Sequence, residues 1–354
     1  MAANDGQHKP RMRVWEPRVI FLVSLLALTV LDRRITTYLD PTTGDEPFYL
    51  MTAMSIARDF DLNECNNYRQ RDEAALYPEF YTSANGGSAR FPVEWKGWRG
   101  APYPLPPHPA LIVPPSRQCI STDPNVPLPA DGTGNELYSK HGLGLSLLVL
   151  PMFTLGGRAL VVFFLNVLGA LLAVNIYRLA REATHRVWPA LLTWLAFAFT
   201  VPLLPYSFLI FPEMPAALLV VYAFRRIRLW ENNRWQVAAV GFSLAFLPWL
   251  HYRFTPVTAS LFLYYLYQEL RHRTKHRYVD LGLICGQSGV AAVLLMIFFY
   301  HRYGRVMPNA GDHAGSSDLA GTARGAAGLF LDQQWGLFIA APVFILTLVG
   351  VLIM

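Results

Sequence analysis

The sequence carries little charge for its length. Only 15% of its 354 residues are Asp, Glu, Lys or Arg, whereas 53% are hydrophobic, and long apolar runs recur from residue 19 to the last residue. A soluble globular domain has about 25% charged residues and shorter apolar runs. The composition therefore excludes an ordinary soluble enzyme and predicts an all-α polytopic membrane protein.

Cysteine is also scarce. The chain has three cysteines and no CxxC or Cys/His spacing, which excludes a disulfide framework and the usual structural zinc sites. Cys285 lies in an apolar run, whereas Cys65 and Cys119 share one long polar segment. The sequence leaves open whether these two form a bridge or stay free thiols.

The net charge of +6 does not point to nucleic acid. The basic residues fall in short clusters between apolar runs, and membrane topology explains this pattern without any ligand. We therefore expect a membrane as partner and no nucleic acid.

Apolar run length and flanking charge predict eight membrane spans. A cytoplasmic N-terminus at 1–18 precedes an uncleaved transmembrane anchor at 19–34. The other spans, all within 158–354, are expected near 158–178, 187–207, 214–224, 236–252, 254–270, 279–300 and 336–354. With the N-terminus inside, the basic loops after Tyr177, Phe224 and Glu269 are all cytoplasmic. This alternation requires that residues 142–156 form an interfacial or re-entrant helix and do not cross.

Two external segments follow from this topology. The first is a large loop at 35–157 with juxtamembrane helices, and the second is the loop 301–334. Residues 304–328 are rich in Gly and Ala without hydrophobic periodicity, so we expect them to be mobile. The chain stops inside an apolar run after Gly350, so we expect a C-terminally truncated sequence.

The stretch GDEPFYL places Asp45 and Glu46 at the head of an amphipathic helix, with Pro47 in its first turn. Helix capping alone would explain these acids. The predicted topology brings five more ionisable side chains to the same face: Glu213, His251, Arg253, Lys140 and His141. Because such groups are costly at a membrane, they generally face a cavity or one another. The sequence therefore predicts a polar site at the outer membrane boundary.

Six segments in order along nearly the whole chain carry a resemblance. They are GDEPFYL, RDFDL with NNY, KHGLGLSLLVLP, FPEMPAALL, LPWLHYRF and GLFLDQQWGLFIAAPV. This order resembles bacterial members of the GT-C superfamily of integral membrane glycosyltransferases, such as the protein O-mannosyltransferases and the lipid A aminoarabinose transferase. The resemblance implies a GT-C-like transmembrane helix bundle in the cytoplasmic membrane, with more spans than eight in most family members.

The resemblance also implies an activity. A sugar would pass, with inversion, from a polyprenyl-phosphate-linked donor to an acceptor hydroxyl at the external or periplasmic face. The acceptor would be a glycan, a lipid or a protein of the cell envelope.

Roles for the site residues follow from the same resemblance. Asp45 matches the family's acidic residue in the first external loop and would be the general base. Glu46 would orient it, or hold a divalent cation (Mg or Mn) together with it. Glu213 would support the substrate or the metal. The donor phosphate would be bound by Lys140, His141, His251 and Arg253. Arg253 is favoured because a guanidinium can bind two phosphate oxygens, although interfacial anchoring also explains it, as a solvated loop position explains Lys140.

Two other classes of function stay open. A lipid or ion transporter or flippase would place charges deep in the spans and show paired discontinuous helices, but the ionisable residues lie mostly at span ends. A non-enzymatic membrane scaffold of the same fold would not need the acids and bases that the chain has. The residues do not specify the sugar, the acceptor, metal dependence or the oligomeric state.

Overall fold

A computed structural model describes residues 12–38, 45–70, 111–112, 138–139, 141–201, 203–230, 233–272, 277–303, 306, 319–332, 336–347 and 350. The regular structure in this part of the chain is helical, except for two short antiparallel strands, β1 (Leu111–Ile112) and β2 (Tyr138–Ser139). The predicted all-α class is confirmed for these residues. Lys140 and Cys119 lie outside them, whereas Cys65 is disulfide-bonded and Cys285 is a free, exposed cysteine.

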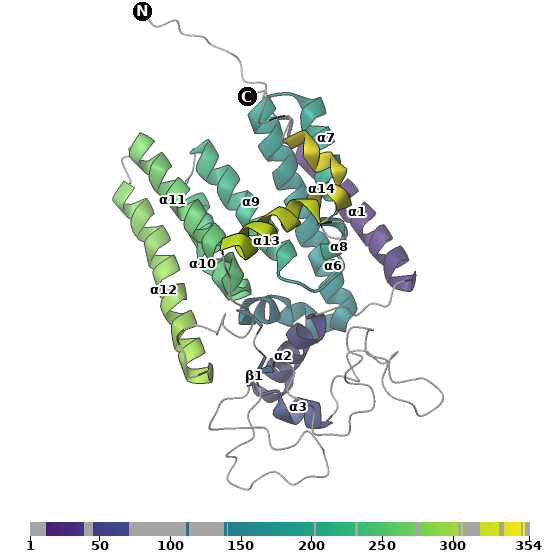
Figure 1. Cartoon of the computed structure of the whole chain (residues 1–354), viewed down its shortest axis with the longest axis vertical. Helices are drawn as coiled ribbons and strands as arrows, with labels where there is room; N and C mark the ends of the chain where they lie inside the picture. The colour runs from purple at the N-terminus through teal and green to yellow at the C-terminus, as the bar shows by residue number, and fades with distance from the viewer. Residues whose placement is uncertain are drawn as a thin grey trace, which may run out of the picture.

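The long helices form one bundle (Figure 1). They are α1 (Trp15–Tyr38), α6 (Leu143–Thr184), α7 (Val187–Ala198), α9 (Glu213–Leu229), α10 (Arg234–Leu250), α11 (Thr255–His272) and α12 (Arg277–Tyr303). At the upper end of the bundle in Figure 1, α6, α9 and α11 end and α7, α10 and α12 begin. The helices α2 (Glu46–Asp59) and α3 (Cys65–Gln70) lie at the lower end, as does the turn between α10 and α11.

The central element is α6, which contacts α1, α2, α7, α9 and α10. Several of its apolar side chains are fully buried in the main core, among them Leu145, Val149, Val161 and Leu165. The helix is broken at Gly156 and Gly157, where the backbone is not helical and Gly157 has φ +61°. The part before the break lies crosswise under the bundle (Figure 1). The break falls at the boundary predicted between the segment 142–156 and the span 158–178.

Two predicted spans are not continuous helices. The span 187–207 consists of α7, which ends at Ala198, and the short helix α8 (Leu203–Tyr206). Twelve helical residues cover only about 18 Å, less than the roughly 30 Å of a hydrocarbon core. In the span 336–354, α14 (Leu337–Ala340) stops before the 3-10 turn η4 (Pro342–Phe344). Pro342 lacks an N–H and disfavours the helical conformation of Ala341, whose φ and ψ are −140° and 77°.

Part of the segment 304–328, which was expected to be mobile, is helical in the structure. Residues Leu319–Leu331 form the helix α13, and its Phe330 ring lies 5.4 Å from the Phe338 ring of α14. Alanine and leucine recur in the α13 sequence and favour a helix, which outweighs the cost of its three glycines. Hydrophobic periodicity alone does not reveal this propensity.

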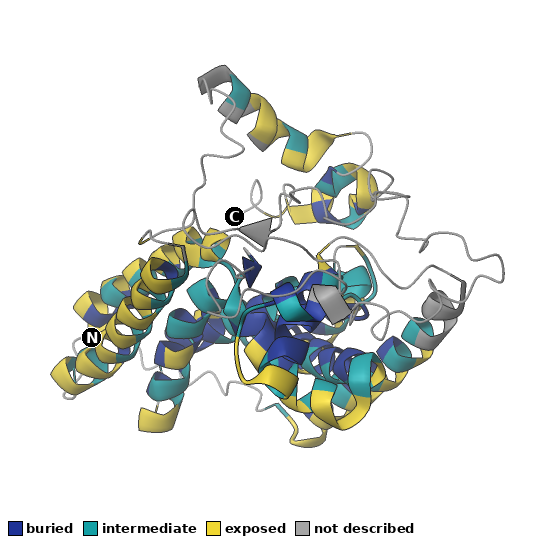
Figure 2. Cartoon of the chain, turned by 90° about the horizontal axis from the view of Figure 1, so that it is seen from below, coloured by how far each residue is buried: buried dark blue, intermediate teal, exposed yellow. Residues whose placement is uncertain are grey.

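In the described part of the chain, two helices are long and apolar enough to cross a membrane, namely α6 and α12. This is fewer than the eight predicted spans. The two helices differ in burial. In the apolar 18-residue stretch of each helix, 61% of the residues are buried in α6 but only 6% in α12. Figure 2 shows α11 and α12 at the left edge, coloured largely as exposed.

Candidate active site

Asp45 lies at the N-cap position of α2 but does not cap it with its side chain. Its backbone carbonyl accepts a hydrogen bond from the Phe48 N–H at 3.1 Å. The carboxylate, which is 52% exposed, has Oδ1 at 3.8 Å from Nε2 of His141. Helix capping therefore does not account for this side chain, and the nearest base is a residue almost a hundred positions away.

His141 is held between two rings of α2. Its imidazole stacks on Phe48 at 5.2 Å and lies tilted against Tyr49 at 5.1 Å, and the side chain is only 6% exposed. Its backbone N–H donates to Ser139 Oγ at 3.2 Å. The packing fixes the ring beside Asp45, with which it forms an ion pair when it is protonated.

Two glycines explain how the chain reaches this position. A Cβ atom on Gly142 would lie 2.2 Å from the Leu250 carbonyl oxygen, and one on Gly144 would lie 2.6 Å from the Trp249 carbonyl oxygen. Backbone meets backbone here, so no larger side chain fits without movement. The contact brings His141 beside the end of α10, and a hydrogen bond from Ser146 Oγ to the Tyr49 carbonyl at 2.9 Å fixes α6 against α2.

Glu213 and Arg253 form an ion pair between the start of α9 and the 3-10 turn η2 (Tyr252–Phe254). Arg253 donates through Nη2 to Glu213 Oε1, and its side chain is 48% exposed. The other carboxylate oxygen of Glu213 is buried and has no hydrogen-bond partner. His251 orients the turn, because its Nδ1 accepts a hydrogen bond from the Arg253 backbone N–H at 3.2 Å.

The charges of these groups act on one another. Burial raises the pKa of the Tyr49 phenol, the negative charges of Asp45 and Glu213 raise it further, and Arg253 opposes them. Burial also raises the pKa of Glu213, which Arg253 lowers and Asp45 raises. Asp45, Tyr49, Glu213 and Arg253 therefore share one electrostatic environment, although they come from α2, α9 and η2.

Glu46 does not have the position that the sequence analysis gave it. Its side chain is fully buried and faces the protein interior. Its Oε1 accepts from Arg158 Nε at 2.5 Å, and its Oε2 accepts from Arg158 Nη2 at 3.3 Å and from the Ile210 backbone N–H at 3.4 Å. Glu46 thus connects α2 to α6 and to the segment before α9, and it is a positioning residue.

The expected cation site of Asp45 and Glu46 does not fit these contacts. Both Glu46 oxygens are engaged by N–H donors, whereas Asp45 faces His141. In the described ranges no three His, Cys, Asp or Glu side chains converge as metal ligands. We therefore derive no step through a metal ion.

Arg158 was missed by the sequence analysis. It follows the Gly156–Gly157 break directly and stands alone at the head of an apolar run, on the face that the topology assigns to Asp45 and Glu213. That position was the available signal, because an isolated arginine at a span end needs an acidic or aqueous partner.

Fold and site together define a class of protein: a helical bundle with a carboxylate, an imidazole and an acid–guanidinium pair at one end. Comparisons with protein-family models, with curated proteins and with solved structures find no match.

Proposed function

We propose that this chain is an integral membrane glycosyltransferase that moves a sugar from a polyprenyl-phosphate-linked donor to an acceptor hydroxyl at the external face of the cytoplasmic membrane. The observation that carries the proposal is the meeting of Asp45, His141, Glu213 and Arg253 at one end of the bundle. Together they supply a partly exposed carboxylate and a guanidinium that share one electrostatic environment. The transfer of a phosphate-linked sugar to a hydroxyl requires a base for the hydroxyl and a positive charge for the phosphate.

The roles follow from exposure and pairing. Asp45 accepts the proton of the acceptor hydroxyl. At the same time the hydroxyl oxygen of the acceptor attacks the anomeric carbon of the donor sugar from the face opposite the leaving group. The bond between that carbon and the phosphate oxygen breaks, and the phosphate leaves with the bonding pair. Arg253 and His141 stabilise the charge that develops on the phosphate.

Arg253 can take this role while it stays paired. Only its Nη2 is engaged by Glu213, and a guanidinium carries five N–H donors. Glu213 holds the group in place, and the 48% exposure of the Arg253 side chain leaves donors accessible to a phosphate. His251 acts on Arg253 through the backbone of η2.

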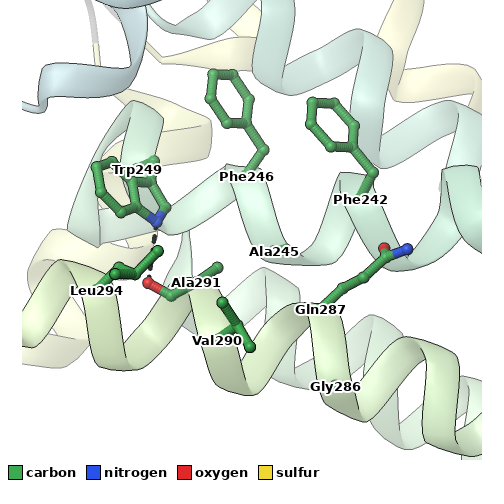
Figure 3. Close-up of a pocket in the computed structure, with 9 residues that line it drawn as sticks. All are labelled: Phe242, Ala245, Phe246, Trp249, Gly286, Gln287, Val290, Ala291 and Leu294. Carbon is green, nitrogen blue, oxygen red and sulfur yellow. Dashed lines mark hydrogen bonds between the residues drawn. The ribbon is translucent and has the colours of Figure 1, made fainter.

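An apolar groove of about 610 Å³ between α10 and α12 is suited to the lipid chain of the donor. Figure 3 shows residues that line this groove, among them Phe242, Phe246 and Trp249 of α10 and Val290 and Leu294 of α12. Trp249 donates from Nε1 to the Ala291 carbonyl at 3.1 Å and stands two residues before His251. A polyprenyl chain in this groove would therefore end at the polar site.

The burial of α12 supports a membrane environment for the bundle. In a soluble protein a long apolar helix lies in the core and is mostly buried. In α12, by contrast, only 6% of the apolar 18-residue stretch is buried. Its large side chains, such as Val290, Val293 and Ile297, are about half exposed or more. Lipid covers such a surface at little cost, whereas water does not.

The test is sugar transfer by membranes that contain the full chain, with a panel of radiolabelled polyprenyl-phosphate sugars. Wild type is compared with Asp45→Asn at equal expression. The matched control is Asp59→Asn, because Asp59 is exposed at the other end of the same helix, about 20 Å away. We expect transfer in wild type and in the control, and a loss of at least a hundredfold in Asp45→Asn, the lower range for a lost general base.

Two results would contradict the proposal. Unchanged transfer in Asp45→Asn would remove Asp45 from the mechanism. No turnover with any donor, from wild-type protein that unfolds cooperatively on heating, would rule out this activity and favour transport or a scaffold.

A further inference from the structure

A second polar cavity lies at the opposite end of the bundle, where α1 begins and where α6 ends and α7 begins. It has a volume of about 560 Å³. Its polar lining is formed by Arg13, Glu16, Tyr177 and Arg181, and Trp15, Val19 and Leu191 contribute to its apolar lining. None of these residues takes part in the candidate active site.

The only acid in the lining is already hydrogen-bonded. Glu16 is buried, and its Oε2 accepts from the Tyr177 hydroxyl at 2.7 Å. Its Oε1 accepts from the Arg13 backbone N–H at 3.0 Å. The Arg181 Nε lies 3.8 Å from Glu16 Oε2, beyond hydrogen-bond distance. Glu16 therefore neutralises at most one of the two guanidiniums in this cavity.

The arginines have donors to spare. Arg181 is only 7% exposed, yet its Nε has no hydrogen-bond partner. The Arg13 side chain is exposed, and in the part of the chain that the structure describes its guanidinium forms no ion pair. A buried guanidinium N–H without a partner is costly, so an anion in the cavity would stabilise this end of the bundle.

The apolar side of the cavity restricts the kind of anion. Trp15 is 55% exposed and Val19 is 45% exposed, so an apolar strip continues from the arginines along the outer face of α1. With two arginines and one glutamate, the lining carries a net charge of +1, which matches a single negative charge. A phosphodiester with acyl chains has both properties.

We propose that this cavity binds the headgroup of an anionic phospholipid, with its phosphate between Arg13 and Arg181 and its acyl chains along Trp15 and Val19. Basic pockets between helices at the cytoplasmic end of a bundle are suited to such lipids. The lipid holds the start of α1 against α6 and α7. This inference rests on the proposed membrane placement of the bundle and is independent of sugar transfer.

The experiment is native mass spectrometry of the detergent-purified full chain, titrated with phosphatidylglycerol or phosphatidylcholine. We expect preferential binding of phosphatidylglycerol, weakened about fivefold in Arg13→Gln, as expected for the loss of one basic side chain near an anionic lipid. Arg181→Gln is a second variant, and its melting temperature is measured alongside because the residue is buried. The matched control is Arg234→Gln, an exposed arginine at the same end of the bundle, and it should bind as wild type does.

Three outcomes would overturn the proposal. Equal binding of both lipids would show that the headgroup charge is not recognised. Unchanged binding in Arg13→Gln and Arg181→Gln would place the lipid elsewhere. If millimolar sodium phosphate displaces phosphatidylglycerol and raises the melting temperature as much, the ligand is a soluble phosphate and no lipid is needed. All three readouts are independent of the transferase assay.

Discussion

Glu64, between α2 and α3, is a buried acid with one hydrogen-bonded carboxyl oxygen. It is fully buried, its Oε1 lies 2.5 Å from Thr52 Oγ1, and its Oε2 has no hydrogen-bond partner. Thr52 Oγ1 also lies 2.9 Å from the Phe48 carbonyl oxygen, and a hydroxyl has a single proton to donate. If Thr52 donates to Phe48, the proton between Thr52 and Glu64 belongs to the Glu64 carboxyl. Burial raises the pKa of Glu64 to about 8, although the hydrogen bond with Thr52 opposes this shift.

The raised pKa makes stability depend on pH in a defined direction. In the unfolded chain the carboxyl loses its proton near its ordinary pKa of 4.5, whereas the folded protein keeps the proton up to about pH 8. The folded state therefore binds more protons in this interval, and its free energy of unfolding falls as pH rises. At about 1.4 kcal/mol per pH unit, the loss between pH 5 and pH 7 is about 3 kcal/mol.

The substitution Glu64→Gln tests this reasoning. An amide stays neutral at every pH and can still donate to Thr52, so the variant should lack this part of the pH dependence. We expect the melting temperature in detergent to fall between pH 5 and pH 7 by roughly 4 °C more in wild type than in Glu64→Gln. Asp59→Asn, in the same segment but exposed, should follow wild type. Parallel pH profiles of wild type and Glu64→Gln would refute the assignment of the proton.

Two further predictions concern how the site is held. Gly142→Ala should lower both the melting temperature and sugar transfer, because its Cβ would meet the Leu250 carbonyl at 2.2 Å, whereas Gly282→Ala, with nothing within 4 Å, should change neither; equal behaviour of the two would contradict the backbone contact. Arg158→Gln should destabilise the protein by about 3–5 kcal/mol in chemical unfolding, since it leaves the buried Glu46 carboxylate without its charge partner. Adding Glu46→Gln should restore part of that loss, and a fully additive double variant would argue against direct coupling.

The features that the sequence predicted correctly depend on local signals. Apolar runs locate α1, α9, α10, α11 and α12 to within a few residues, because a helix needs no distant partner for its backbone hydrogen bonds. The boundary between 142–156 and the span 158–178 was predicted from the alternation of the basic loops and from the short run 142–156. The consecutive glycines at 156 and 157 supply the cause of the break there. The helix interruptions at Ala198 and Ala341 were not predicted, because the length of an apolar run does not show where a proline-containing segment stops being helical.

What the sequence could not give is the choice of partners across the bundle. Glu46 and Arg158 are 112 residues apart, and Asp45 and His141 are separated by a similar length of chain. The isolated position of Arg158 signals that it needs a partner, but the local sequence does not say that this partner is Glu46. Likewise, the sequence around Glu64 suggests only an acidic residue in a loop. Its burial and its contact with Thr52 are visible only in the structure.

The relation between Asp45 and Glu46 shows why adjacent acids at a helix head need not act together. Consecutive helical residues point about 100° apart, so two adjacent acids need not face the same surroundings. Glu46 uses the inward direction to bind Arg158 and the Ile210 N–H, and these bonds fix the head of α2 against two other elements. Asp45 is thereby held beside His141 and in the field of Glu213 and Arg253. General-base catalysis needs a partly exposed base on a rigid support. The buried Glu46 therefore serves the proposed role of Asp45 by holding it in position.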